Sequence, residues 1–133
     1  MEDFNFENMD KLDKIFFMQN KFDSDLIKNR HLEDITPEQW IQKQVLAMLS
    51  ELSELLDEVN FKWWKNPKPL DKPATKEELV DILHFFVGMC LRMGMTSEEL
   101  YQIYMKKNKE NFDRQYGNSL KKGYELDNKE TND

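Results

Sequence analysis

The chain contains a single cysteine, Cys90, and only four glycines and four prolines among 133 residues. One cysteine excludes an intramolecular disulfide framework and leaves no thiol cluster for structural zinc, which favours a reducing, cytoplasmic setting. The scarcity of turn residues argues against an all-β fold, whereas nine phenylalanines, three tryptophans and eight methionines argue against a disordered chain. The composition therefore predicts a compact helical domain.

Long apolar runs and an excess of positive charge are also absent. The N-terminus is acidic and no apolar segment follows it, so we expect no secretory signal. The longest apolar stretch, residues 79–93, is too short for a membrane span and carries Asp81, His84 and Arg92. The net charge of −7 gives no basic surface for nucleic acid. We expect neither a membrane nor a nucleic-acid partner, and we expect an anionic ligand to bind together with a metal ion.

The spacing of apolar residues predicts the first two helices. Residues 9–27 carry apolar side chains three or four positions apart, which is typical of a helix. Thr36 followed by Pro37 and Gln39 predicts the N-cap of a second helix, in which an uninterrupted apolar stripe from residue 45 to 59 indicates a face committed to a core. Three of the four prolines lie within residues 65–74, which predicts a loop.

Two further capping patterns predict two more helices. Thr75 and Glu78 form a capping box, and the helix that they open is apolar almost all round as far as Met93, so we expect it to be central and buried. Gly94 ends this helix, and Thr96 begins the last one. We predict an all-α bundle of four or more helices over residues 1–116, with the second and third helices antiparallel, and a polar, mobile tail over residues 117–133.

Acidic residues recur at helical spacing on both central helices. Glu51, Glu54 and Glu58 share one face of the second helix, which alone is more typical of a solvated acidic edge than of a site. Glu78 and Asp81 lie among apolar residues, where burying carboxylates costs several kcal/mol unless a partner compensates them. A helix-start acid plus a hydrogen-bonded aspartate is the alternative explanation. Convergence of the carboxylates would instead form the oxygen-rich site that Mg²⁺ selects.

The pattern Glu51-x-x-Glu54, a gap of 23 residues, then Glu78-x-x-Asp81 resembles the metal-binding motif of the all-α nucleoside triphosphate pyrophosphatases. That superfamily includes the MazG-like proteins and the dimeric dUTPases. Further blocks in the same order look like those of the dimeric dUTPase family. They are Gln19, Phe61-Lys62-Trp63-Trp64-Lys65, Asp81-Ile82-Leu83-His84-Phe85 and Lys107-Asn108-x-x-Asn111-x-x-Arg114-Gln115.

The resemblance implies a metal-dependent pyrophosphohydrolase. It implies that Glu51, Glu54, Glu78 and Asp81 hold Mg²⁺, for which Mn²⁺ can substitute, and that a bound water attacks the α-phosphate. Glu54 is our preferred residue for taking the proton of that water, and Glu51 is the alternative, because sequence does not separate base from ligand. Lys107, Asn111 and Arg114 share one face of the last helix, where they are suited either to phosphate contact or to a solvated basic face.

The resemblance also implies a nucleoside pocket formed by Gln19, Trp63, His84 and Phe85. Adjacent Trp63 and Trp64 cannot both face a core, so we assign Trp63 to the base and Trp64 to packing. His84 has a core histidine as its alternative role. Family members often carry asparagine where this chain has Asp23, which we also expect to contact the base. An ionised aspartate only accepts hydrogen bonds, so it could accept from N3–H of uracil or from the amino group of cytosine.

The leading function is therefore Mg²⁺-dependent hydrolysis of dUTP to dUMP and pyrophosphate, with dUDP open as a second substrate. Because of Asp23, hydrolysis of dCTP or of other and modified nucleotides by a MazG-like enzyme stays open as the alternative. A non-catalytic helical interaction module is a third reading, disfavoured by the intact acidic residues. Exposed apolar residues, among them Phe17, Met18, Trp40 and Ile41, together with the resemblance predict a homodimer.

Overall fold

The computed structural model describes residues 6–127, and this part of the chain consists of helices and loops without strands. A 3₁₀ turn η1 is followed by four α-helices, so the predicted all-α class is confirmed. The elements are η1 (Phe6–Asn8), α1 (Lys11–Asn29), α2 (Pro37–Glu58), α3 (Lys72–Arg92) and α4 (Ser97–Gln115). The chain divides into two compact units, Met1–Ser97 and Glu98–Asp133, which are described separately below.

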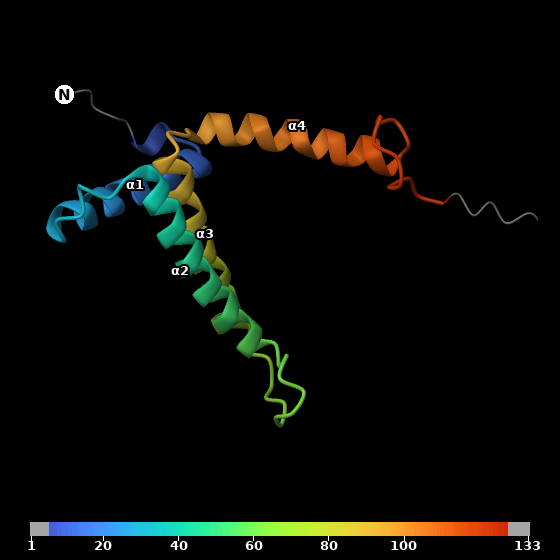
Figure 1. Cartoon of the computed structure of the whole chain (residues 1–133), viewed down its shortest axis with the longest axis horizontal. Helices are drawn as coiled ribbons and strands as arrows, with labels where there is room; N and C mark the ends of the chain where they lie inside the picture. The colour runs from blue at the N-terminus through green and yellow to red at the C-terminus, as the bar shows by residue number, and fades with distance from the viewer. Residues whose placement is uncertain (1–5, 128–133) are drawn as a thin grey trace, which may run out of the picture. The chain divides into compact units, whose positions relative to one another are not determined.

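The first unit is built around α3. Helices α2 and α3 form an antiparallel hairpin, and α1 packs against α3 near the end of the hairpin opposite its connecting loop (Figure 1). The fully buried apolar core is small and comprises Phe16 of α1 with Val87 and Cys90 of α3. Helix α3 is therefore central, as predicted. Its burial was overestimated, because Leu79, Leu83 and Phe86 stay exposed in the single chain.

Helix α2 turns to its partner a face that only partly coincides with its apolar stripe. Its half-buried positions include Gln44, Met48, Glu51, Leu55 and Glu58, which recur at the four- and three-residue spacing of one helix face. Met48 and Leu55 of the predicted stripe lie on this face, whereas Val45, Leu49, Leu52, Leu56 and Val59 each expose more than a third of their surface. The prediction that the whole stripe enters the core of the chain is therefore wrong, and these five residues form an open apolar face.

The N-terminus of α2 follows the sequence closely. The Thr36 hydroxyl accepts from the backbone N–H of Gln39 at 3.2 Å, and the Gln39 side chain accepts from the Thr36 backbone N–H at 3.0 Å. This reciprocal capping box, with Pro37 at the first helical position, satisfies two N–H groups that helix geometry leaves unpaired. The predicted start of α2 is confirmed.

Helix α3 begins one turn earlier than predicted. Asp71, not Thr75, is the N-cap, and its carboxylate accepts from the Ala74 backbone N–H at 3.0 Å. Pro73 lies in the first turn, where its missing N–H costs no hydrogen bond, and the Thr75 hydroxyl donates to the Asp71 carbonyl. The last residues of the predicted loop, 72–74, therefore belong to helix α3.

The end of α3 and the connection to α4 match the sequence. Gly94 has a φ of +72°, and the following Met95 N–H donates to the Cys90 carbonyl at 2.9 Å. This is the left-handed C-terminal turn that glycine adopts without a steric penalty. No single helix in the described residues is long and apolar enough to cross a membrane, and α3 and α4 pass that test only when they are counted together across their break.

The second unit consists of α4 and the segment that follows it. The Ser119 hydroxyl donates to Glu110 at 2.6 Å, and the Leu126 N–H donates to the Gln115 carbonyl at 2.9 Å. Arg114 donates to Glu110 at 3.2 Å and lies over the Tyr124 ring. Residues 117–126 are thus held against the end of α4. The mobility predicted for the whole tail stays a prediction, because residues 128–133 lie outside the described part.

The corrected start of α3 can be tested by removing its cap. We expect Asp71→Ala to lower the free energy of unfolding by about 1 kcal/mol, because the N–H of Ala74 loses its acceptor. Asp71→Asn keeps an accepting oxygen and should stay close to wild type. Urea unfolding monitored by circular dichroism measures both. An Asp71→Ala variant as stable as wild type would contradict the assigned N-cap.

Candidate metal and nucleotide site

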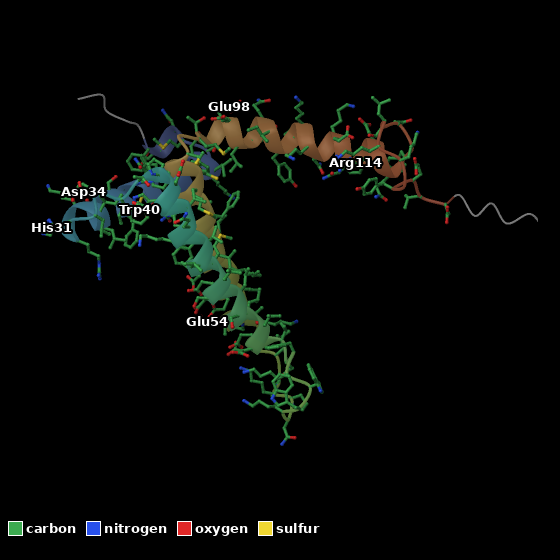
Figure 2. All side chains as sticks on the ribbon, viewed as in Figure 1. His31, Asp34, Trp40, Glu54, Glu98 and Arg114 are labelled. Carbon is green, nitrogen blue, oxygen red and sulfur yellow. The ribbon has the colours of Figure 1, made fainter. Side chains whose placement is uncertain are left out.

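Three carboxylates from the two hairpin helices meet near the connecting loop. Glu51 and Glu54 on α2 and Glu78 on α3 each offer a carboxylate oxygen, and these oxygens lie within 4.8 Å of one another. Helix geometry places Glu51 and Glu54 on adjacent turns, and the antiparallel neighbour brings Glu78 to them. Figure 2 shows Glu54 in the half of α2 nearest the loop, far along the helix from Trp40. The arrangement can hold a divalent cation.

The cluster lacks a protein cation. Among the described residues, no lysine or arginine forms an ion pair with these three carboxylates, and one oxygen each of Glu51 and Glu78 is buried without a hydrogen-bond partner. Interaction with the Glu51 carboxyl group, then burial, then the charge of Glu54 raise the pKa of Glu78 to about 7. Unpartnered oxygens of converging carboxylates are the donor set that Mg²⁺ or Mn²⁺ takes, so these residues fit the predicted metal.

Asp81, the fourth predicted ligand, is placed differently. It lies one turn beyond Glu78 on α3 and is exposed, and it does not belong to the group of three in the described residues. The expectation that it is buried is wrong, because that side of α3 is open in the single chain. The structure thus brings together three of the four predicted metal ligands.

A cavity of about 1000 Å³ lies between α1 and the α2–α3 hairpin. Four residues predicted to bind the nucleoside line it: Gln19 and Asp23 from α1, and His84 and Phe85 from α3. Ala47, which also lines it, precedes Glu51 by four residues, or about 6 Å along the helix axis. The cavity and the carboxylate cluster are therefore neighbours along one rigid hairpin.

Three polar residues of the cavity form a hydrogen-bonded row. His84 Nδ1 lies 2.8 Å from Gln19 Oε1, and Gln19 Nε2 donates to Asp23 Oδ1 at 2.9 Å. Burial raises the pKa of Asp23, while its hydrogen bond from Gln19 and the charges of Arg92 and His84 lower it by less. His84 is thus part of the cavity wall and not a core histidine, and Gln19 is buried between its two partners.

The structure also adds residues to the cavity that the sequence did not suggest. Arg92 and Gln44 line it, and each has a buried polar atom, Arg92 Nε and Gln44 Oε1, without a hydrogen-bond partner in the described residues. The α2 contribution is a second helical pattern that was overlooked beside the apolar stripe. It consists of Trp40, Lys43, Gln44 and Ala47, at the spacing i, i+3, i+4 and i+7.

The tryptophans of the connecting loop lie apart from this cavity. Trp63 is 85% exposed and does not line the cavity, so its assignment to the base stays a prediction. Trp64 is 60% exposed and contacts the edges of Trp63 and Phe61, so the prediction that it packs in the core is wrong. Asn60 closes the loop, since its side chain forms two hydrogen bonds with the backbone of Lys68, at 2.8 and 2.9 Å.

The predicted phosphate-binding residues lie on α4, in the second unit. Lys107 and Asn111 are exposed, and Arg114 is half-buried by its contacts with Glu110 and Tyr124. Their spacing places all three on one helix face, as predicted. Their role in binding phosphate stays a prediction.

Three converging carboxylates on a helical hairpin, next to a largely apolar cavity that carries a few polar groups, define an all-α protein with a candidate metal and ligand site. The dUTPase family model matches residues 11–96, which include α1, α2 and α3. The chain belongs to this family. The match ends before α4.

Relatives in phages are similar to part of the chain. The dCTP pyrophosphatase of Enterobacteria phage T4 is 36% identical over 87 residues, which cover 55% of this chain and 51% of that protein. The dCTP pyrophosphatase of Enterobacteria phage LZ5 is 34% identical over 74 residues, covering 56% and 43%. A DNA replication protein of phage T4 is 33% identical over 81 residues, covering 50% and 21%. The chain thus spans about half the length of the two pyrophosphatases. No solved structure gives a significant match.

The raised pKa of Glu78 predicts how the stability of the metal-free protein depends on pH. The pKa is about 7 in the folded chain against an ordinary 4.5, so the folded state binds this proton more tightly. The resulting stabilisation is fully present below pH 4.5 and is lost as the pH rises through 7. In melts with EDTA, the Tm of wild type should fall over this window relative to the Tm of Glu78→Gln.

Glu77→Gln is the matched control, because Glu77 is the exposed neighbour of Glu78 on α3. It should keep the pH dependence of wild type. If Glu78→Gln also keeps that dependence, the three carboxylates do not interact in the folded protein.

Proposed function

We propose that this chain is a metal-dependent nucleoside triphosphate pyrophosphohydrolase acting on deoxypyrimidine nucleotides. The observation that carries the proposal is the convergence of Glu51, Glu54 and Glu78 within 4.8 Å, one to two helical turns from the cavity lined by Gln19 and His84. In the reaction water adds to the α-phosphorus, the bond to the bridging oxygen breaks, and pyrophosphate leaves. The products are a nucleoside monophosphate and pyrophosphate.

The acidic cluster supplies the groups for this chemistry. Glu51, Glu54 and Glu78 would hold Mg²⁺ or Mn²⁺, with Asp81 as an outer ligand one turn further along α3. A divalent cation held by these residues would lower the pKa of a bound water towards neutrality. Glu54 is exposed, unlike half-buried Glu51 and Glu78, and is therefore the best placed of the three to take the proton of the attacking water.

The cavity supplies the binding of the nucleoside. His84 and Phe85 form one wall, and Gln19 and Asp23 form another, so an aromatic face and polar edges are both available to a pyrimidine ring. The sequence blocks favour dUTP, whereas acceptor-only Asp23 and the names of the phage relatives favour dCTP. We therefore keep both as candidate substrates. Lys107, Asn111 and Arg114 are proposed to contact the phosphates, on the basis of their sequence block.

The test of this function is pyrophosphate release from a panel of nucleotides. We expect release from dCTP or dUTP with Mg²⁺ present, with little from dATP or dGTP, and none after addition of EDTA. Release from no nucleotide would contradict the proposed function. Release from purine and pyrimidine nucleotides alike would indicate a broader MazG-like enzyme.

Changing one carboxylate tests the mechanism without changing the fold. We expect Glu54→Gln to lower turnover at least about a hundredfold, the scale of losing a positioned acid–base group. The Tm without metal should equal or exceed that of wild type, because the variant removes repulsion between like charges. Glu77→Gln is again the matched control and should retain wild-type turnover. A Glu54→Gln variant with full turnover and unchanged Mg²⁺ dependence would show that the cluster is a solvated surface feature.

We also propose a second copy of this chain as its partner. The α2 stripe of Leu49, Leu52 and Leu56 and the exposed Leu79 and Leu83 of α3 form more open apolar surface than a monomer of this size usually carries. Phe17 and Met18 of α1 are exposed as predicted, whereas Trp40 and Ile41 are half-buried. An isologous dimer would cover such a surface.

Light scattering at micromolar concentration should give twice the mass of the chain. We expect Leu49→Asp to shift the protein towards the monomer, because it places a charge on the stripe, which is 55% exposed at this residue. Leu120→Asp, at a fully exposed position of the second unit, should leave the mass unchanged. A monomeric wild type would contradict the dimer.

A further inference from the structure

The row His84–Gln19–Asp23 has a defined direction of hydrogen bonding. An ionised carboxylate can only accept, so Gln19 must turn its Nε2 amide towards Asp23 Oδ1, 2.9 Å away. The carbonyl Oε1 of the same side chain then faces His84 Nδ1 at 2.8 Å and can only accept. His84 Nδ1 therefore carries a proton and donates.

Asp23 is held in this row by its surroundings. Its second oxygen, Oδ2, is buried and has no hydrogen-bond partner in the described residues. Gly88 of α3 leaves room for Gln44 beside Asp23, because a Cβ there would lie 2.6 Å from Gln44 Nε2, whereas its distance of 3.4 Å from Asp23 Oδ2 is an ordinary contact. A carboxylate enclosed in this way acts on a ligand through Gln19 and not by direct contact.

The proton on Nδ1 determines the role of the other imidazole nitrogen, Nε2. A neutral histidine with a proton on Nδ1 has a lone pair on Nε2, so Nε2 is a hydrogen-bond acceptor. We infer that Asp23 is a positioning residue which, through Gln19, fixes His84 as an acceptor at Nε2, so that the cavity favours a pyrimidine that presents an amino group. The choice of base rests on the proposed function, whereas the hydrogen-bonding row does not.

Two kinds of pyrimidine edge distinguish this arrangement. A 4-amino pyrimidine offers two N–H donors on its exocyclic nitrogen, whereas a 4-oxo pyrimidine presents a carbonyl acceptor at the same position. An acceptor at Nε2 satisfies the first and leaves the second unpaired. The other charged groups that line the cavity are Lys14 of α1, Lys43 of α2 and Arg92 of α3, all of them cations. Among them, the charge of Arg92 favours the ionised form of Asp23 on which the direction of the row depends.

An asparagine at position 23 removes the constraint. Its amide can donate to Gln19 Oε1, so Gln19 can turn over and donate to His84 Nδ1, which moves the histidine proton to Nε2. Nitrogen-15 NMR of histidine-labelled protein at about pH 8, where an unperturbed imidazole is neutral, distinguishes the two tautomers. The chain has only two histidines, and exposed His31 serves as an internal reference.

We expect wild-type His84 to be protonated at Nδ1 and Asp23→Asn to shift it towards Nε2. Titration of the same samples with dCMP and dUMP should show that wild type prefers dCMP, and that the variant lowers this preference at least about fivefold, the scale of one unmatched buried hydrogen bond. Asp25→Asn makes the same chemical change at an exposed position of α1 and should alter neither result.

His84 that keeps its Nδ1 proton in Asp23→Asn, or a ratio of dCMP to dUMP affinity that does not change, overturns the inference. Gln19→Met removes the central side chain of the row and should also shift His84 away from the tautomer protonated at Nδ1. If it does not, the inference is overturned as well. If no nucleotide is hydrolysed, the proposed function fails, but the tautomer and the two affinities still decide this inference.

Discussion

The repulsion among Glu51, Glu54 and Glu78 is the constraint on which the rest of the first unit depends. Carboxylate oxygens within 4.8 Å of one another, with no ion-paired lysine or arginine in the described residues, oppose the association of α2 and α3. Contact along the rest of the hairpin must therefore hold the two helices in register at this point. Removing the charges would make a more stable hairpin, whereas a bound cation would offset the same repulsion.

The half-buried acids at the two ends of the hairpin have different surroundings. Near the loop, Glu51 and Glu78 keep oxygens without partners, so an external cation is needed to satisfy them. Near α1, one oxygen of Asp23 accepts from the Gln19 amide and the carboxylate lies in the field of Arg92, while its Oδ2 is also buried without a partner in the described residues. The first arrangement suits an exchangeable ion and its phosphate ligand, whereas the second suits a fixed wall that recognises a base.

The sequence predicted what depends on local chemistry. The Thr36 cap and the Gly94 turn follow from neighbours within one or two turns, whereas the meeting of Glu51 and Glu54 with Glu78 was predicted from two antiparallel helices and the family resemblance. It misplaced the start of α3, because Asp71 competes with Thr75 for the same cap and Pro73 is compatible with either choice. It also wrongly predicted that the whole α2 stripe packs in the core, because periodicity identifies an apolar face but not the partner that covers it.

The polar residues that meet in the cavity could likewise not be predicted from the spacing of residues in the sequence. Gln44 and Arg92 are ordinary surface residue types in the sequence, and only the packing of three helices against Gly88 brings them beside Asp23. The role of Asp23 changes for the same reason. From sequence it was a direct contact for the base, but in the fold its free oxygen is enclosed and its other oxygen orients Gln19. A single aspartate can therefore influence which base the cavity accepts without touching it. Its carboxylate fixes the orientation of the Gln19 amide, and that amide fixes which nitrogen of the His84 imidazole carries the proton.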